Sequence, residues 1–240
     1  MDRLIDLAIS DLHLGREPCA ISDNLIALLD SVRGQLNHLI IAGDLFEVWL
    51  GDDLASEFQW SVGERIRSAG AATTTFLPGN RDFLMGSRWA QHAGCELADE
   101  ARIKMHGQTA RITHGDELCL DDTDYQAWRT QCRDPQWQQA FLSQTAEARL
   151  AFAERARKQS QSQGAVKASD IADVSPRALT LAAVDSSLVV HGHTHRPAIH
   201  RGRITRVVLG DWRPGAWVLV NSDQPHLGLW DHGWAARIEL

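Results

Sequence analysis

Short apolar runs, each followed by polar side chains able to bind metal or phosphate, recur along the chain. Residues 3–9 form a nearly continuous apolar run, which is typical of a strand covered on both faces. Further runs occupy 39–42 and 72–77, and segments with helical spacing at 21–30 and 57–69 separate them. This alternation of strands and helices predicts a layered α/β fold.

The pattern changes after residue 100, where short β-branched runs predominate and helical spacing is rare. Residues 101–105 and 109–113 predict two strands joined by a tight turn. More short strands are expected at 188–190, 206–209, 217–220 and 235–239. We therefore expect a second sheet packed face to face with the first, with helices outside. In such a sandwich the polar strand ends lie along one edge, where open α/β sheets place their ligands.

The alternation stops between residues 121 and 173. Three helices are expected at 125–129, 137–145 and 147–159, followed by a polar, flexible joint at Gln159–Gly164. The segment carries too many large apolar groups for a solvated linker, namely Trp128, Trp137, Phe141, Leu150 and Phe152. We expect an inserted helical cap at 121–173 on a core formed by 1–120 and 174–240.

The predicted cap also differs from the core in charge. Between Arg149 and Lys167 there are five basic residues and one acidic residue, although the whole chain has a net charge of −7. Basic and aromatic residues together favour a membrane surface or an anionic amphiphile as partner. The alternative is a solvated helix face whose aromatic side chains pack on the core.

Composition narrows the class of protein. The chain has 240 residues, 44% of them hydrophobic, enough for one substantial core. The negative net charge argues against nucleic acid as a partner. Cys19, Cys95, Cys119 and Cys132 show no Cys-x-x-Cys spacing, which indicates reduced thiols that do not bind metal.

No apolar run is long enough to span a bilayer. The first three residues lead directly into the first predicted strand, without the apolar region of a signal peptide. We therefore expect a cytoplasmic protein.

Five strand ends supply the candidate chemistry. They carry Asp-x-His, Gly-Asp, Gly-Asn, His-Gly-Asp and Gly-His-x-His sequences, and their oxygen and nitrogen donors are Asp11, His13, Asp44, Asn80, His114, His193 and His195. Seven donors are too many for one divalent ion, which takes four to six ligands and keeps a position for water. Two ions that share a carboxylate fit this number, and Asp44 is the natural bridge.

Two such ions bring more positive charge than Asp11 and Asp44 remove. A site that stays positive in a dry cleft favours a multiply charged phosphate ester or anhydride. Two ions about 4 Å apart position a hydroxide for in-line attack and stabilise the phosphoryl oxygens. The donor set therefore predicts phosphoester hydrolysis.

The five motifs, in this order, resemble those of the calcineurin-like metallophosphoesterase superfamily. The resemblance extends from Asp11 to His195, and it implies a two-sheet metallophosphoesterase sandwich. It also implies that Asp11, His13, Asp44 and His195 hold one ion, and that Asp44, Asn80, His114 and His193 hold the other. Asp44, Asn80, His114 and the adjacent Arg81 would form the catalytic group.

Arg81 departs from the superfamily pattern, in which a histidine that protonates the leaving group often follows the asparagine. An arginine stays charged and does not act as a general acid at neutral pH. The leaving group should therefore need no proton, as holds for a phosphate monoester released from a pyrophosphate. Arg81 would instead bind phosphate oxygens.

Longer sequence blocks narrow the resemblance. Residues 43–47, 79–83, 114–122, 125–126 and 191–197 are similar to those of the UDP-2,3-diacylglucosamine diphosphatase family of lipid A biosynthesis. That resemblance implies a Mn²⁺-dependent hydrolase that releases UMP and 2,3-diacylglucosamine 1-phosphate. It further implies peripheral attachment to the cytoplasmic side of the bacterial inner membrane, and a helical cap that covers the acyl chains. We also expect a monomer.

The same resemblance implies the substrate contacts. Asn80 and Arg81 would touch the phosphates together with His193, and Asp122 would touch the glucosamine. Ser160 and Lys167 would lie on the uridine or phosphate side, and Gly164 stands where the family usually has an asparagine.

Two other functions remain open from the residues alone. A metallophosphoesterase acting on another nucleotide diphosphate derivative or a cyclic nucleotide would use the same metal ligands but would not need an apolar cap. A non-catalytic binding protein on this scaffold would be expected to lack ligands, and all seven are present. The donor set accepts Mn, Fe, Co or Zn, so it does not fix the metal.

Overall fold

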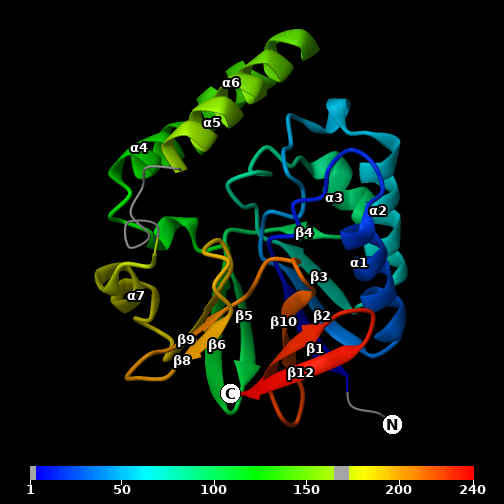
Figure 1. The fold of residues 1–240 in the computed structure, drawn as a ribbon, viewed down its shortest axis with the longest axis vertical. Helices are drawn as coiled ribbons and strands as arrows, with labels where there is room; N and C mark the ends of the chain where they lie inside the picture. Colours follow the sequence, from blue (N-terminus) through cyan, green and yellow to red (C-terminus); the bar gives the residue numbers. More distant parts are fainter. Residues whose placement is uncertain (1–3, 165–172) are drawn as a thin grey trace.

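The computed structural model of the protein describes residues 4–164 and 173–240, with side chains described outside 159–164. Two sheets lie side by side in the body of the molecule, and a group of helices lies beyond one end of them (Figure 1). The fold class expected from the sequence, an α/β two-sheet sandwich flanked by helices, is confirmed.

The larger sheet has seven strands in the order β12-β11-β10-β1-β2-β3-β4. The strands are β1 Ile5–Ile9, β2 Leu36–Ile41, β3 Thr73–Phe76, β4 Glu96–Leu97, β10 Ala216–Asn221, β11 His226–Trp230 and β12 Trp234–Glu239. Strands β1 to β4 are parallel, because a helix follows each of the first three and returns the chain to the same end. These helices are α1 Ala20–Ser31, α2 Glu57–Ser68 and α3 Ser87–Ala93.

The central strands of this sheet are buried on both faces because their apolar side chains alternate between two cores. Leu7 and Ile9 of β1 face the helices α1 to α3, together with Leu39 of β2. Ala8 and Ile40, which point to the other face, pack against the second sheet. A period of two along a continuous apolar run therefore supplies both cores, as the run of residues 3–9 predicts.

The second sheet has five strands in the order β5-β6-β7-β9-β8. They are β5 Ala101–Met105, β6 Gln108–Thr113, β7 Leu188–His191, β8 Ala198–His200 and β9 Thr205–Val208. Its outer face packs Val189 against Ala178 and Ala182 of helix α7, which spans Pro176–Ala182. The layers therefore run helix, sheet, sheet, helix.

The prediction that all strands of the second half form the second sheet is wrong for residues 217–220 and 235–239. Strand β10 pairs antiparallel with β1, with Leu7 opposite Val220, and β11 and β12 continue this larger sheet. The side-chain amide of Asn221 donates to the Asp6 carboxylate at 2.7 Å, which supports this register at the strand end. Both sheets offer similar apolar faces, so alternation alone did not distinguish between them.

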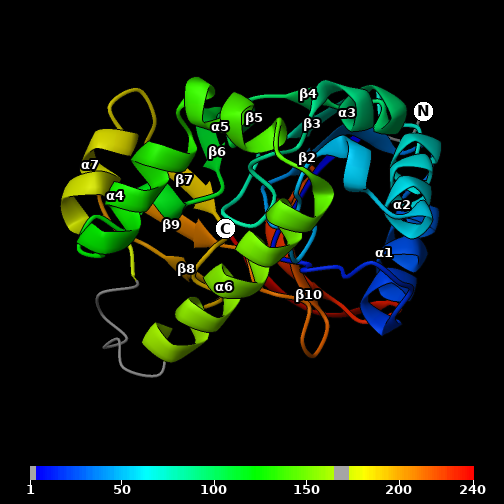
Figure 2. The same ribbon diagram turned by 90° about the horizontal axis from the view of Figure 1, so that it is seen from above.

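Between β6 and β7 of the second sheet, and before α7 in the sequence, lies a run of three helices, called here the α4–α6 segment. They are α4 Thr123–Cys132, α5 Pro135–Leu142 and α6 Ala146–Gly164. In the view from above, α6 passes across the edge of the two sheets (Figure 2). The predicted flexible joint at Gln159–Gly164 is wrong, because these residues continue α6. Among the described residues, no helix is both long and apolar enough to cross a membrane.

Candidate metal centre and active site

The loops that follow the strands meet through backbone hydrogen bonds. The amides of Asp11 and His13 donate to the carbonyls of Gly43 and Asp44 at 3.1 and 2.9 Å, and so join the loops after β1 and β2. The amide of Gly192 donates to the carbonyl of His114 at 2.8 Å and joins the loops after β6 and β7. The sandwich thereby brings side chains from distant parts of the sequence to one edge.

Three of the predicted ligands form a first group. The Nε2 atoms of His13 and His195 lie 3.2 Å apart, and Nε2 of His195 lies 3.2 Å from Oδ1 of Asp11. Two imidazole nitrogens this close need a proton or a cation between them, because both otherwise present lone pairs. The group thus offers two nitrogen ligands and a carboxylate to a single ion.

Three others form a second group around Asn80. Its Oδ1 lies 3.0 Å from Nε2 of His114 and 2.9 Å from Nδ1 of His193. The two imidazole rings face each other edge to face, with centroids 5.2 Å apart. An amide oxygen and two imidazole nitrogens converge here in the same manner as in the first group.

The Asp44 carboxylate lies between the two groups. Its Oδ2 is 3.9 Å from Nε2 of His13, and its Oδ1 is 3.7 Å from Nε2 of His114. Ligand atoms of Asp11, Asp44 and His114 also lie within 4.8 Å of one another. One carboxylate that points an oxygen at each group has the geometry that a shared ligand requires.

Five of these seven residues have left-handed backbone conformations. The φ angles are between 51° and 64° for Asp11, His13, Asp44, His193 and His195. This region is sparsely populated by non-glycine residues, although Asp, Asn and His enter it more readily than others, and it is enriched at functional sites. The backbone therefore turns sharply at each strand end and directs these side chains toward the shared edge.

Two glycines allow the loops to approach closely. A Cβ atom on Gly79 would lie 2.2 Å from Oδ1 of Asp44, and one on Gly192 would lie 2.2 Å from Oδ2 of Asp11. Only glycine fits where a backbone presses against a ligand carboxylate. The sequences Gly79-Asn80 and Gly192-His193 are therefore required by close packing as well as by the ligands that follow each glycine.

Further contacts, made by the Nδ1 atoms of two histidines, orient the candidate ligands. Nδ1 of His114 donates to the carbonyl of Ala42 at 2.9 Å, which leaves Nε2 free to bind metal. Nδ1 of His13 lies 3.4 Å from the Glu47 carboxylate, an arrangement typical of metal-binding histidines. His191 instead contacts the backbone carbonyl of Gly192 at 2.8 Å.

Asp82 links the loops that carry Asp44 and Asn80. Its buried carboxylate accepts hydrogen bonds from the amides of Leu45 and Gly79, both at 2.8 Å, and more weakly from those of Asp44 and Phe46. Burial and the Asp44 charge raise the pKa of Asp82 to about 6. Sequence reasoning did not identify this residue, and its only signal was a carboxylate two positions after Asn80 in an apolar stretch.

The charges of the site shift the pKa values of its ligands in opposite directions. Burial raises the pKa of Asp11, but a hydrogen bond from His195 and the charge of His114 outweigh it and lower that pKa to about 2. Burial lowers the pKa of His114, but the Asp44 and Asp11 carboxylates raise it to about 9. His193 has its pKa lowered to about 3 by burial, so it is neutral and ready to bind metal.

Arg81 stands beside this centre. Its amide donates to Oδ1 of Asp44 at 2.8 Å, while its buried Nε has no hydrogen-bond partner among the described residues. A buried guanidinium nitrogen without an acceptor costs free energy unless a ligand supplies one. The residue is therefore placed to receive an anion next to the metal ligands.

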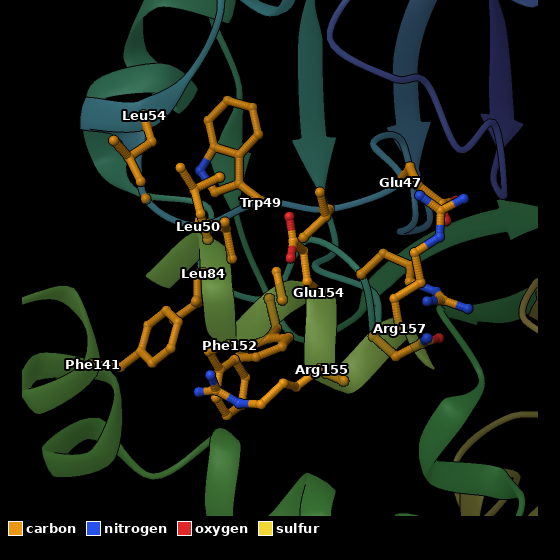
Figure 3. Close-up of a pocket in the computed structure, with 18 of the residues that line it drawn as sticks. Glu47, Trp49, Leu50, Leu54, Leu84, Phe141, Phe152, Glu154, Arg155 and Arg157 are labelled. Carbon is orange, nitrogen blue, oxygen red and sulfur yellow. The ribbon is translucent and has the colours of Figure 1, made fainter. Parts of the chain in front are cut away.

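A cavity of about 1060 Å³ opens beside Asn80 and Arg81. Its walls come from the loops after β2 and β3 and from the α4–α6 segment. The apolar part of the lining is Trp49, Leu50, Leu54, Phe83, Leu84, Trp128, Trp137, Phe141, Leu150 and Phe152. Figure 3 shows Phe141 and Leu84 on one side of this cavity, and Glu47 and Arg157 on the opposite side.

The aromatic side chains of the α4–α6 segment pack with one another across this cavity. Trp137 stacks on Phe141 with centroids 5.0 Å apart, and Phe152 lies 5.1 Å from Phe141. Trp128 contacts Trp137 at 5.3 Å. These aromatic groups therefore line a cavity on the core, and Trp137, Phe141 and Phe152 also pack against the core, as the alternative interpretation of the sequence expected.

Arg149 is not a surface charge, contrary to its inclusion in the predicted basic face. It is buried, donates to the carbonyl of Leu50 at 2.7 Å, and pairs with both oxygens of Asp53. Gly51 makes room for it, since a Cβ there would lie 2.7 Å from its Nη1. This ion pair fastens α6 to the core, and the remaining basic side chains at the cavity include Arg155 and Arg157.

The predicted substrate contacts fall into different places. Asp122 is the N-cap of α4, where it accepts from the amide of Tyr125. His193 lies in the second metal group. Ser160 and Gly164 belong to the last turns of α6, where side chains are not described, and Lys167 lies outside the described residues.

The comparisons with known proteins agree with this geometry. The family model described as calcineurin-like phosphoesterase matches residues 7–197. Chaetomium thermophilum Vps29 shares the fold, with a TM-score of 0.52 and 12% identity over 99% of this chain and 97% of that one. Fold and site thus define the class, a calcineurin-like phosphoesterase.

Curated relatives define the family within that class. A UDP-2,3-diacylglucosamine hydrolase of Xanthomonas campestris is 45% identical over 90% of this chain and 95% of its own. One from Cellvibrio japonicus is 42% identical over 89% of this chain and 93% of its own. The chain therefore belongs to the calcineurin-like phosphoesterases and, within them, to the UDP-2,3-diacylglucosamine hydrolase family.

Proposed function

We propose that this hydrolase cleaves the pyrophosphate bond of UDP-2,3-diacylglucosamine to give UMP and 2,3-diacylglucosamine 1-phosphate, a step of lipid A biosynthesis. The observation that carries the proposal is the apolar cavity of about 1060 Å³, which is lined by Asn80 and Arg81 as well as by aromatic side chains. A substrate with a charged diphosphate and two acyl chains matches both parts of this lining. The names of the relatives agree with it.

The donor set fits two divalent ions. Asp11, His13, Asp44 and His195 would hold one, and Asp44, Asn80, His114 and His193 the other, since Asp44 points an oxygen toward each group. When bound, the ions supply Lewis acids for the phosphoryl oxygens and lower the pKa of water. We propose Mn²⁺, the metal that the family resemblance implies; the imidazole, amide and carboxylate donors accept it but do not select it over Fe, Co or Zn.

Arg81 and the candidate metal ligands have different roles in the proposed hydrolysis. Asp44, Asn80 and His114 would hold the ions against the reacting phosphoryl group, and Arg81 would donate to phosphate oxygens with its Nε, which has no acceptor among the described residues. Because the leaving group is a phosphate monoester, no side chain has to give it a proton. The absence of a general acid after Asn80 therefore fits cleavage of an anhydride.

Residues 121–173 act in this proposal as a cap over the acyl chains. Asn80, Arg81 and His193 would contact the phosphates, Asp122 the glucosamine, and Ser160, Gly164 and Lys167 the uridine or phosphate side. The enzyme would work as a monomer bound peripherally to the cytoplasmic side of the bacterial inner membrane, because its substrate has two acyl chains that favour a bilayer.

The decisive experiment compares UDP-2,3-diacylglucosamine with its deacylated analogue. The enzyme is stripped of metal and supplied again with Mn²⁺, and products are identified by mass. UMP and the diacyl sugar phosphate should form only with metal, and much faster when the acyl chains are present. Equal rates on the two substrates would favour a soluble nucleotide derivative instead, and no turnover with any metal would favour a binding protein.

A single substitution at the cavity sharpens this test. Leu150 lines the cavity and is partly exposed, so Leu150→Asp puts a charge on the acyl side without disturbing the buried core. We expect turnover of the diacylated substrate to fall and turnover of the deacylated one to persist. Leu181→Asp, on the exposed side of α7, is the matched control and should change neither.

A further inference from the structure

The metal centre and the apolar cavity share one short loop. Asn80 belongs to the second metal group, Arg81 follows it, and Phe83 lines the cavity two residues later. The Phe83 ring packs edge to face on Trp128 with centroids 6.5 Å apart, and lies 6.3 Å from Trp137. A shift of Phe83 would therefore move residues that contact metal and phosphate.

Helix α4 also contacts both places. Trp128 of α4 faces the cavity, and Tyr125, one turn earlier, stacks on the ring of the metal-group residue His193 with centroids 5.9 Å apart. The Tyr125 hydroxyl donates to the buried Asp116 at 2.5 Å, and Nε of Arg129 donates to the same carboxylate at 2.8 Å. The helix is thus fixed to the loop that carries His114.

Arg133, directly after α4, connects this helix to the Asn80 loop. Its Nη2 donates to the carbonyls of Pro78 and Gly79, both at 3.0 Å, and lies 3.7 Å from the Asp116 carboxylate. Its guanidinium also lies over the Phe83 ring, 5.6 Å from the centroid. One side chain therefore contacts the beginning of the loop, its aromatic end and the carboxylate that anchors α4.

We propose that Arg133 is a positioning residue, which holds the loop of Asn80 and Arg81 against the metal centre and makes the rate of the chemical step depend on what fills the cavity. The inference rests on the proposed function, because it takes acyl chains as the contents of the cavity. Acyl chains packed against Phe83 and Trp128 press on a loop and a helix that Arg133 ties together. Their binding energy is then used to align Arg81 with the phosphate instead of only holding the substrate.

We expect such an effect to change kcat and to leave KM nearly unchanged. Misplacing a group that orients the reacting atoms costs about 10- to 100-fold in activity. Arg133→Ala should therefore lower kcat on UDP-2,3-diacylglucosamine by about 10- to 100-fold, with little change in KM and an unchanged metal content. It should lower kcat on the deacylated analogue much less, so that the advantage given by the acyl chains shrinks.

The experiment measures kcat and KM for both substrates with the Mn²⁺-loaded enzyme, together with bound metal and thermal unfolding. Arg67→Ala is the matched control, because Arg67 likewise donates to two successive carbonyls, those of Gln91 and His92, but lies on the outer helices. Phe83→Leu is the second variant, since it keeps every hydrogen bond of Arg133 and removes the ring contacts of Phe83 with Arg133, Trp128 and Trp137. It should reduce the acyl-chain advantage in the same way.

Three results would overturn the proposal. They are an unchanged kcat in Arg133→Ala, a rise in KM alone, and an equal fall of kcat on both substrates. If Arg133→Ala does not fold, an unaltered acyl-chain advantage in Phe83→Leu has the same meaning. Failure of the proposed function looks different, because the unmodified enzyme itself would then show no preference for the diacylated substrate.

Discussion

The metal centre and the α4–α6 segment face the same cavity but are built in different ways. At the metal centre, sharp left-handed turns and backbone hydrogen bonds fix the side chains, and glycines let the loops touch. In the α4–α6 segment, side chains contact other side chains, and aromatic rings pack at centroid distances of 5.0 to 6.2 Å. A few charged links join the segment to the core, among them Arg149 with Asp53 and Arg129 with Asp116.

Under the proposed function, this difference matches what each region would recognise. Metal ions and a phosphoryl group require ligand atoms within tenths of an ångström, which a strained and over-determined backbone provides. Flexible acyl chains require only an apolar volume, which rotating aromatic side chains adapt to fill. Changes at the metal centre should therefore abolish function, whereas changes in the α4–α6 segment should adjust it.

The largest effect is expected from Asp44→Ala. This substitution removes the carboxylate that points an oxygen at each ligand group, so metal binding and hydrolysis should both be lost. Metal analysis and product assays would check this, with Asp30→Ala on the surface as the control. Two equivalents of metal retained by Asp44→Ala would contradict the shared-ligand assignment.

A smaller loss is expected from Arg81→Ala. Removing one preorganised donor to a phosphoryl oxygen costs about 100-fold in turnover or more. The seven ligands stay in place, so metal content should remain at two equivalents. Parallel assays of turnover and bound metal test both parts, and loss of metal in this variant would show that Arg81 supports the centre structurally.

The pH dependence of metal affinity should further distinguish the metal centre from the α4–α6 segment. The pKa of His114 is raised to about 9 in the folded chain, so its proton stabilises the metal-free fold at pH below 6.5, and this contribution is lost as the pH rises through about 9. Metal binding requires the neutral ring and displaces this proton. Apparent metal affinity should therefore rise about tenfold per pH unit from neutral pH toward pH 9.

Metal titrations at several pH values would measure this dependence. A metal affinity that does not change over that range would contradict the charged state of His114. Arg157→Ala, at the cavity, should leave the pH dependence unaltered, because this residue contributes no metal ligand.

The smallest effect is expected from Asp53→Ala. It leaves the buried Arg149 with the Leu50 carbonyl as its remaining acceptor among the described residues, and we expect the free energy of unfolding to fall by about 1 to 2 kcal/mol. Asp30→Ala breaks the ion pair between Asp30 and Arg33, two side chains that are each about half exposed. It should lower the free energy of unfolding by less than about 0.5 kcal/mol. Urea unfolding of both variants provides the comparison, and equal costs would mean that Arg149 does not fasten α6.

The convergence of the candidate metal ligands was predictable because parallel strands of one sandwich end at the same edge, and polar residues directly after apolar runs must then meet. Their left-handed conformations were not, because Asp and His occupy ordinary conformations as well. Asp82 was missed for a similar reason. Its partners are backbone amides of two loops, and no side-chain pattern encodes such contacts.

Other features depend on partners far away in the sequence. An arginine in a helical segment predicts a solvated charge. Arg149 is instead buried and forms an ion pair, because Gly51 and Asp53 lie next to it. The polar sequence Gln159–Gly164 fits an exposed helix as well as a flexible joint, since neither buries apolar groups. The place of β10 beside β1 depends on strand pairing between opposite ends of the chain, and local alternation does not decide that.

The distance along the chain between the ligands has a consequence for biosynthesis. His13 and His195 are 182 residues apart, yet their nitrogens lie 3.2 Å from each other. During translation the first group therefore stays incomplete until the β7 loop has left the ribosome, so an ion at this group would be acquired late. An ion bound there then closes a very long loop, and it acts on the entropy of the unfolded chain as a cross-link would.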